Sequence, residues 1–365
     1  MVFEAVNRKL RDLMAAPYSL FGGKAVVFGG DFRQVAPVVL RASPAQIKLM
    51  CLNASDTVWP HVQTLRLTTN MRTQDEEFAQ FLLRVGEGRE PTVTFGEQND
   101  YIRIPDRFLF QPKVVTADIS PEKLLIQEVF PGYQEMQLLP DFLAERAILS
   151  TCNADVDAIN DVATALMYST EERLYRSLDS IPDEEDNVGR YPTEYLNTIT
   201  VSSLPPHKLT LKIGQPIVLL RNMNQKQGLC NGTRLIVRQL KDRLIEAEIM
   251  HGDRQGHLKW IPRIPIITND GDGQSPVEFC RLQFPVRPAV AMTINKAQGQ
   301  TLKSVGVYLP KPVFGHGQLY VALSRCSDPS QLRVLIKDGL IPAMLYSRKF
   351  LTEKRTESSE EREVW

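Results

Sequence analysis

The sequence alternates between short apolar runs typical of strands and segments whose apolar residues recur at helical spacing. A strand-like run at 146–151 is followed at once by a helical pattern that extends to Leu166, and the alternation resumes between residues 289 and 336. Strand–helix alternation builds parallel sheets with right-handed crossovers, so we predict an α/β fold. Ligands of such sheets bind beyond the carboxyl ends of the strands, and the residues directly after strands are therefore the first candidates for a site.

The N-terminal part carries the same two patterns. Apolar residues at helical spacing predict a helix over 3–14, and the β-branched run 24–28, closed by two glycines, predicts a buried strand. A second helix is expected to begin at Thr73, because Thr73 and Glu76 fit a capping box and the apolar residues that follow form one face.

The texture changes near residue 209 to short alternating strands separated by Gly, Asn and Asp turns. Strands are predicted over 215–220, 234–239 and 244–250, with Asn231-Gly232 as a strong turn signal. This pattern predicts a small β-barrel inserted in the α/β fold. The C-terminal tail is dense in charge and poor in apolar residues, and we expect it to be frayed.

Charge and cysteine usage limit the classes of partner. Lys+Arg and Asp+Glu number 43 each, so the bulk basic field of many nucleic-acid binders is absent and any DNA contact must come from a few local cations. The five cysteines include no C-x-x-C pair, and no metal site is predicted from His251 and His257 alone. No stretch has the length of a membrane span, so no membrane partner is expected.

Two candidate motifs lie in the N-terminal part. Gly29-Gly-Asp-Phe-Arg-Gln34 directly follows the predicted strand, where glycines permit a tight turn and an amide can orient a water or touch a phosphate. The alternative is a turn that Asp31 merely caps. Asn70-Met-Arg72 precedes the second helix, so Arg72 could reach a neighbouring lobe, or it could be a solvated surface arginine.

Two further motifs lie in the C-terminal part. Thr293-Ile-Asn-Lys-Ala-Gln-Gly-Gln-Thr301 stands at a predicted strand-to-helix junction, where backbone N–H groups bind anions, or it is a polar helix start without a ligand. His316-Gly-Gln-Leu-Tyr-Val-Ala-Leu-Ser-Arg325 ends in an arginine that could touch a transferring phosphoryl group or could complement a helix dipole.

Taken together and in this order, the motifs resemble those of the Pif-family DNA helicases of superfamily 1B. The resemblance runs from near Met1 to about residue 336 and includes three further segments: Leu67-Thr-Thr-Asn-Met-Arg72, Gly214-Gln-Pro-Ile-Val-Leu-Leu-Arg-Asn222 and Gly228-Leu-Cys-Asn-Gly-Thr-Arg234. The last of these is similar to the Helitron-transposon branch, as are Tyr191-Pro-Thr-Glu-Tyr-Leu-Asn197 and Leu204-Pro-Pro-His-Lys208.

The resemblance implies a 5′-to-3′ DNA motor whose two RecA-like lobes hold ATP and Mg²⁺ between them. By position, Gln34 would sense the γ-phosphate, while Arg72 and Arg325 would be the arginines offered to that phosphate. The residues that would lie near the nucleotide are Gly30, Asp31, Gly299 and Gln300.

The same resemblance implies single-stranded DNA or a DNA fork as the partner, and leaves protein partners unknown. The residues that would meet DNA are Thr293, Asn295, Lys296, Thr301 and His316. Asn295 stands where many relatives outside the Helitron branch have His, so this contact departs from the usual pattern. The implied compartment is the nucleus or the mitochondrion, although no clear targeting segment is visible.

The resemblance also implies a division into lobes. We expect a remnant of the first RecA-like lobe at 1–68, the second lobe at 69–208 and 281–345, the inserted β-barrel at 209–280, and a charged tail at 346–365. In this family the phosphate-gripping loop and the Mg²⁺-holding acidic pair lie upstream of a helix like 3–14, so the chain is expected to be N-terminally truncated.

No G-x-x-x-x-G-K-[S/T] motif occurs in the sequence; Phe21-Gly-Gly-Lys24 lacks the required spacing and precedes a predicted strand. Because phosphoryl transfer relies on cradled phosphates and Mg²⁺, we expect the chain alone neither to hydrolyse ATP nor to unwind DNA. Two alternatives stay open: a non-catalytic module or transposon-derived pseudo-helicase that binds single strands, and a subunit whose missing strands come from another polypeptide.

Overall fold

In the computed structural model of the chain, residues 2–342 are described apart from 38, 40–41, 96–97, 113–118, 135–138, 170, 182–190, 202, 269–274 and 337–339. The chain divides into two compact units. The smaller unit comprises Met1–Arg103, Val313–Val321 and Ile341–Trp365, and the larger comprises Ile104–Pro312 and Ala322–Leu340. The expected tail at 346–365 lies outside the described residues, and the expected lobe boundaries stay a prediction.

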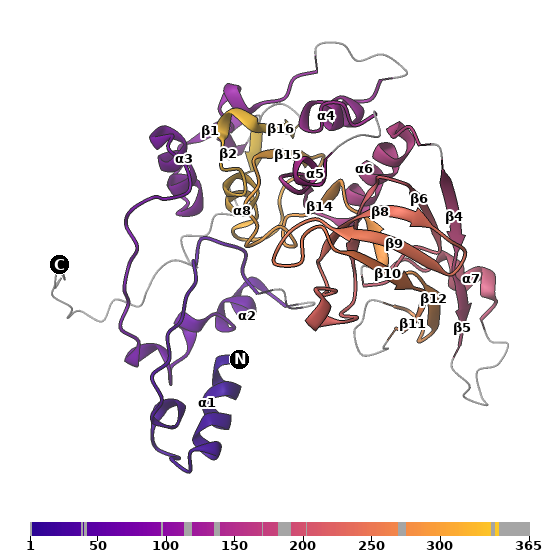
Figure 1. Cartoon of the computed structure of the whole chain (residues 1–365). Coiled ribbons are helices and arrows are strands. Elements are labelled where there is room, and N and C mark those ends of the chain that lie inside the picture. The colour runs from indigo at the N-terminus through magenta and orange to yellow at the C-terminus, as the bar shows by residue number, and fades with distance from the viewer. Residues whose placement is uncertain are drawn as a thin grey trace. The chain divides into compact units, whose positions relative to one another are not determined.

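Figure 1 shows the helices and strands of both units. The α-helices are α1 (Val2–Leu13), α2 (Pro44–Leu49), α3 (Glu76–Gly86), α4 (Pro121–Val129), α5 (Pro140–Ala144), α6 (Asn153–Leu166), α7 (Thr193–Thr198) and α8 (Gln318–Ser324). The first strands are β1 (Thr92–Phe95), β2 (Gln98–Arg103), β3 (Arg146–Ser150), β4 (Glu172–Arg176), β5 (Leu178–Ser180), β6 (Lys208–Lys212), β7 (Pro216–Leu219), β8 (Arg234–Leu240) and β9 (Leu244–Ile249). The remaining strands are β10 (Leu258–Pro262), β11 (Ile264–Ile267), β12 (Cys280–Gln283), β13 (Val286–Pro288), β14 (Ala291–Thr293), β15 (Ser304–Leu309), β16 (Leu332–Ile336) and β17 (Leu340–Pro342).

The smaller unit confirms both predicted helices and corrects two details. Helix α3 buries the expected apolar face, but its N-cap is Asp75, whose side chain accepts from the Phe78 N–H; the predicted capping box of Thr73 and Glu76 is wrong. The predicted strand at 24–28 is also wrong. A strand needs a neighbour, and none of the described strands pairs with residues 24–28. The segment is also not buried, since Val27 is 96% exposed.

A four-stranded parallel sheet, in the order β14-β3-β15-β16, forms the centre of the larger unit. Its core contains Ile148 of β3 together with apolar side chains of α4 and α6. Strand β3 is buried along almost its whole length, as is typical of parallel strands covered on both faces. The predicted α/β fold is confirmed, including the strand at 146–151 and the helix that follows it.

The predicted strands near 215, 234 and 244 are present as β7, β8 and β9. They belong to a five-stranded antiparallel sheet in the order β10-β9-β8-β7-β13, whose inner face forms a second apolar core. Gly232 takes a positive φ of 89°, which fits the predicted Asn231-Gly232 turn. Closure of this region into a barrel stays a prediction.

Buried arginines hold the larger unit together. Arg234, the first residue of β8, donates to the carbonyls of Ala144, Leu143, Arg146 and Ala289 over 3.0–3.3 Å. It thereby joins the antiparallel sheet to α5 and to the start of β3. Burial lowers the pKa of the Arg234 guanidinium to about 10, so the group stays charged at neutral pH.

Two more arginines fasten the segment around α7. Arg281 forms an ion pair with Asp179 at 2.7 Å, with both side chains buried, and also donates to the carbonyls of Leu196, Ile199 and Pro205. Arg287 pairs with Asp157 at 3.1 Å and donates to the carbonyls of Val201 and Leu204. The two arginines therefore bind the backbone of the segment 193–206, while its apolar side chains, among them Leu196 and Leu204, pack with Ile266 and Phe279.

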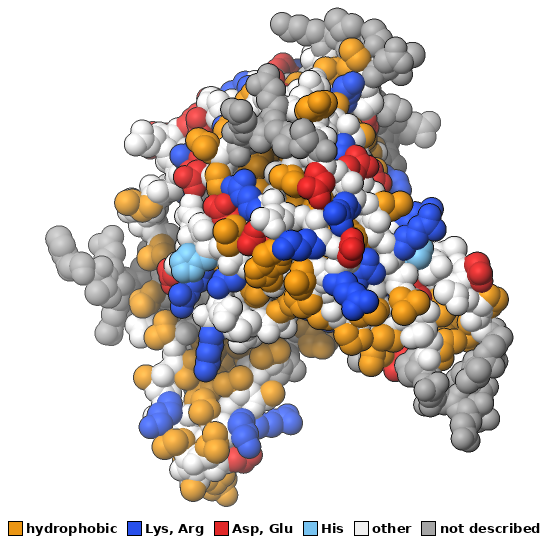
Figure 2. Space-filling view, turned by 45° about the vertical axis from the view of Figure 1, so that its right-hand side comes forward, with side chains coloured by type: hydrophobic (Ala, Val, Ile, Leu, Met, Phe, Trp, Pro, Cys, Tyr) orange, Lys and Arg blue, Asp and Glu red, His pale blue; other side chains and the backbone are white. Residues whose placement is uncertain are grey.

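Surface composition agrees with the zero net charge. Figure 2 shows Lys and Arg side chains interspersed with Asp and Glu over the face that it presents. Among the described residues, no helix is both long and apolar enough to cross a membrane.

Arg281→Met tests the buried ion pair, because it leaves the Asp179 carboxylate buried without its partner. We expect the free energy of unfolding to fall by about 3–5 kcal/mol, measured by urea denaturation. The matched control Arg333→Met removes the exposed pair with Glu128 at 2.8 Å and should cost less than about 1 kcal/mol. Equal losses for the two variants would contradict this assignment.

Candidate functional site

The Gly29–Gln34 loop of the smaller unit is a tight turn fixed by Asp31. The Asp31 carboxylate accepts from the Arg33 N–H at 3.0 Å, and the Gln34 N–H donates to the Asp31 carbonyl at 3.1 Å. An added Cβ at Gly29 or Gly30 would meet no atom within 4 Å. The glycine backbone therefore faces open space, where a ligand could approach.

Residues 316–320, far away in sequence, pack directly on this loop. His316 Nε2 lies 2.9 Å from the Phe32 carbonyl oxygen, and the Tyr320 hydroxyl donates to Asp31 Oδ2 at 3.1 Å. Gly317 has a φ of 76°, and a Cβ there would lie 2.3 Å from the Gln34 carbonyl oxygen. Only glycine fits at this position, because the Gln34 backbone occupies the space of a side chain.

The electrostatics of this contact follow from burial. Burial lowers the pKa of His316, opposed by the Phe32 carbonyl and the Asp31 carboxylate. Burial also raises the pKa of Tyr320, and the neighbouring Asp31 carboxylate raises it further. Near neutral pH both groups are therefore held uncharged, which suits them for hydrogen bonding to the loop.

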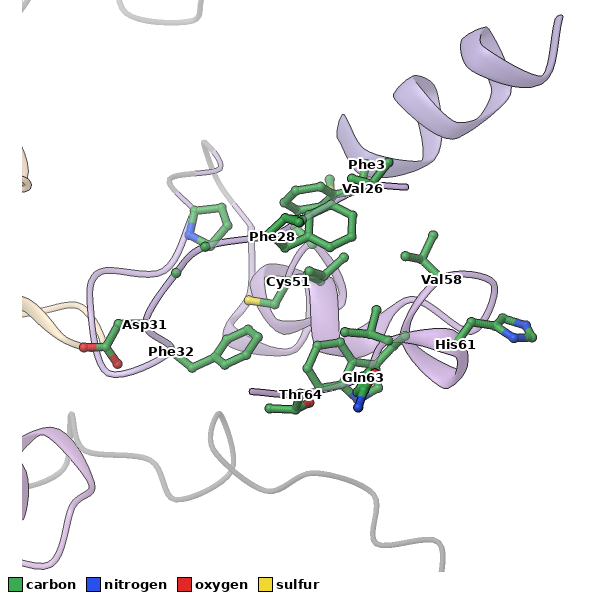
Figure 3. A pocket seen from close by; sticks show the side chains of 18 of the residues that line it. Phe3, Val26, Phe28, Asp31, Phe32, Cys51, Val58, His61, Gln63 and Thr64 are labelled. Carbon is green, nitrogen blue, oxygen red and sulfur yellow. The ribbon is translucent and has the colours of Figure 1, made fainter. Parts of the chain in front are cut away.

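A cavity of about 780 Å³ opens beside the loop and is lined by Gly30, Asp31, Gln34 and His316, among others. Figure 3 shows the rings of Phe3, Phe28 and Phe32 around this cavity, with Asp31 at one end. Its volume lies within the range of small-molecule pockets. The cavity is therefore lined both by polar groups of the Gly29–Gln34 loop and by aromatic side chains.

Arg72 is exposed just before α3, also in the smaller unit. The Asn70 side chain orders the segment before α3. Its Oδ1 accepts from the Arg72 N–H and its Nδ2 donates to the Thr73 carbonyl, both at 3.0 Å. Arg72 is therefore presented by an ordered turn. Its expected contact with a phosphate stays a prediction.

The second candidate loop follows β14 in the larger unit. The predicted helix after Thr293 is wrong: residues 294–299 form successive turns, and Gly299 takes a φ of 85°. Asn295 is partly exposed, while Lys296 and Thr301 are exposed. The loop stands at the carboxyl end of a parallel strand, where ligands of α/β sheets bind.

Arg325 binds the C-terminal end of this loop. Its side chain is fully buried, with Nη1 donating to the Gln300 carbonyl and Nη2 to the Ser324 hydroxyl, both at 3.0 Å. The geometry gives Arg325 a structural contact with the end of the 293–301 loop. Its expected part in phosphoryl transfer stays a prediction.

Lys296 is exposed as a whole residue, yet its ammonium group is partly buried. Burial lowers the pKa of Lys296, the Arg287 guanidinium lowers it further, and the Asp157 carboxylate, which pairs with Arg287 at 3.1 Å, opposes both.

The predicted residues are divided between the two units. One cavity is lined by Gly30, Asp31, Gln34 and His316, and Arg72 is not among its lining residues. The smaller unit holds Gly30, Asp31, Gln34, Arg72 and His316, and the larger holds Thr293, Asn295, Lys296, Gly299, Gln300, Thr301 and Arg325. The roles of Gly317 and Tyr320 were missed. The position of Gly317 directly before a helix was a weak signal for its role. Nothing in the sequence spacing indicated that Tyr320 would reach Asp31.

A metal site made of protein side chains is not found in the described residues. No group of three or more His, Cys, Asp or Glu side chains within the described part of the chain could hold a metal ion. No step is therefore assigned to a metal bound by these residues.

Comparisons with known proteins agree with this geometry. A family model described as "PIF1-like helicase" matches residues 1–95, and one described as "DNA helicase Pif1, 2B domain" matches residues 194–240. The chain is 28% identical over 86% of its length to the ATP-dependent DNA helicase PIF7 of Trypanosoma brucei brucei and covers 32% of that protein. It is 26% identical over 92% of its length to human ATP-dependent DNA helicase PIF1, of which it covers 44%.

Solved structures show the same fold. The crystal structure of Pif1 helicase from Candida albicans matches with a TM-score of 0.59 and 23% identity, over 96% of this chain and 72% of that chain. Bacteroides Pif1 in complex with ADP-AlF3 and ssDNA matches with a TM-score of 0.58 and 21% identity, over 94% of this chain and 69% of that chain. The chain spans between about a third and less than half of the two curated relatives.

Gly317→Ala tests the packing of residues 316–320 on the loop. Alanine is strained at a positive φ, and its methyl group would also collide with the Gln34 backbone. We expect the collision to lower the local stability by about 1–3 kcal/mol beyond the cost of the positive φ. Hydrogen exchange of the amides at 31–36 should quicken. Gly256→Ala is the matched control, with a φ of 78° and no atom within 4 Å. Unchanged exchange at 31–36 in Gly317→Ala would refute the contact.

Proposed function

Since the chain belongs to the Pif1-like helicase family, we propose that it acts in ATP-dependent unwinding of DNA in the 5′-to-3′ direction. Within that activity these 365 residues contribute the Gln34 loop, the Arg72 turn and the DNA-contacting 293–301 loop. The proposed ligands are ATP with Mg²⁺ and single-stranded or forked DNA, and the proposed compartment is the nucleus or the mitochondrion.

The observation that carries this proposal is the contact between two motifs of the family. The Gly-Gly-Asp-Phe-Arg-Gln motif and the His316–Tyr320 segment lie 284 to 289 residues apart, yet they share two hydrogen bonds. In the proposed motor, Gln34 senses the γ-phosphate and must keep a fixed position relative to helix α8, which precedes Arg325. The contact supports such coupling, because movement of Gln34 would be transmitted to the start of α8.

ATP hydrolysis needs more than these groups. The sequence contains no G-x-x-x-x-G-K-[S/T] loop to cradle phosphates, and the described residues offer no cluster for a metal ion. We therefore propose that a polypeptide of these 365 residues does not hydrolyse ATP by itself, because Gln34 and the arginines act on a phosphate that other groups must hold.

A second candidate function is single-stranded DNA binding without catalysis. It is favoured by the placement of the 293–301 loop, whose strand, buried arginine and neighbouring Arg287 all lie within the larger unit. DNA contact by this loop requires nothing from the Gln34 loop. Binding without turnover follows from this arrangement.

The test uses the purified protein and a fluorescent single-stranded oligonucleotide. We expect salt-dependent binding, and Lys296→Gln should weaken it severalfold and reduce the salt slope by about 0.7 for one lost phosphate contact. Lys303→Gln, which removes an exposed lysine paired with Glu145, should leave binding unchanged.

In the same samples we expect no DNA-stimulated phosphate release from ATP. Robust release would overturn the proposed lack of hydrolysis. Absence of single-strand binding by the unaltered protein would sink both candidate functions.

A further inference from the structure

Three cations gather beside β10, an edge strand of the antiparallel sheet in the larger unit. Arg254 Nη2 donates to the Lys226 carbonyl at 3.5 Å, and Lys259 Nζ donates to Gln227 Oε1 at 3.5 Å. One short 3₁₀ turn, η5 (Gln225–Gln227), therefore touches the other two members of the group. Lys226, Arg254 and Lys259 are named here the edge cluster.

The edge cluster is positioned by backbone shape. Gly228 ends the η5 turn with a φ of 81°, and an added Cβ there would lie 3.2 Å from Arg254 Cγ. The absence of a side chain lets the stem of Arg254 lie on the turn. The guanidinium is thus held against the backbone of the turn that carries Lys226.

Within the described part of the chain, no member of the edge cluster forms an ion pair, and their recorded partners are a carbonyl and an amide. Other cations of the larger unit do pair with carboxylates: Arg173, Lys212, Arg238, Arg281, Arg287, Lys303 and Arg333. The exposed Asp253 adjoins Arg254 in sequence, and the Asp141 carboxylate accepts from the side chain of Gln255, so two acids lie near the edge cluster.

Unpaired, pre-positioned cations are complementary to a polyanion. The turns at 222–228 and 251–257 add amide side chains and two histidines but contain no Phe, Tyr or Trp on which an unpaired base could stack. Trp260 follows Lys259 in β10, so its side chain lies on the opposite face of the sheet, where Lys241 covers its ring at 4.6 Å. Contacts through cations and amides, without stacking, suit the sugar–phosphate backbone of a duplex, whose bases are already stacked inside.

We propose that the edge cluster binds the phosphate backbone of duplex DNA. It would be a contact separate from the 293–301 loop, which meets the single strand. The inference rests on the proposed function only in taking DNA as the ligand. It adds the duplex arm of a fork as the part of the substrate that the antiparallel sheet recognises.

The experiment compares the full chain with the triple variant Lys226→Gln/Arg254→Gln/Lys259→Gln. Binding to a fluorescent blunt duplex and to a single-stranded oligonucleotide is measured at several salt concentrations. The control variant Arg173→Gln/Lys303→Gln/Arg333→Gln removes the same number of positive charges, all of them from exposed or partly exposed ion pairs. Thermal unfolding of both variants verifies that they are folded.

We expect the triple variant to bind the duplex at least about tenfold more weakly, with the salt slope reduced by about 2–3 for three lost phosphate contacts. Its single-strand binding should match that of the control variant. Duplex binding that falls no further than in the control variant would overturn the proposal. Loss of single-strand binding in Lys296→Gln bears on the proposed function alone, so the two ideas fail separately.

Discussion

Buried guanidinium groups that donate to backbone carbonyls are the interaction on which the larger unit depends. Arg234 and Arg281 each satisfy three or more carbonyls, and Arg325 satisfies the Gln300 carbonyl, while all three are almost wholly shielded from water. A planar fork with five donors can fasten several chain segments at once. This is how an antiparallel sheet, a parallel sheet and the segment at 193–206 become one body.

Function follows from what this body holds in place. The 293–301 loop leaves the carboxyl end of β14, and its far end is fixed by Arg325, so its exposed polar side chains are presented on a rigid support. The smaller unit uses a different device: Gly317 lets the Gln34 backbone approach closely, and His316 and Tyr320 bond to the same loop. Each unit therefore orders one of the predicted motifs by its own contacts.

Sequence patterns predicted those parts that depend on local periodicity. Strand β3 and helix α6 were predictable because burial on both faces of a strand and on one face of a helix leaves a readable pattern. The strand expected at 24–28 failed because pairing depends on a neighbour that local sequence does not specify. Arg234 could be read only as part of a family motif, since its carbonyl partners lie 55 to 91 residues away.

Arg234→Lys tests the central claim most directly, because Arg234 pairs with no carboxylate in the described part of the chain and the substitution keeps the positive charge while removing the planar fork. The account predicts a loss of about 2–4 kcal/mol in the free energy of unfolding, with faster hydrogen exchange in both α5 and β8. A lysine variant as stable as the original protein, with unchanged exchange in α5 and β8, would contradict the claim that guanidinium–carbonyl bonding unites the larger unit.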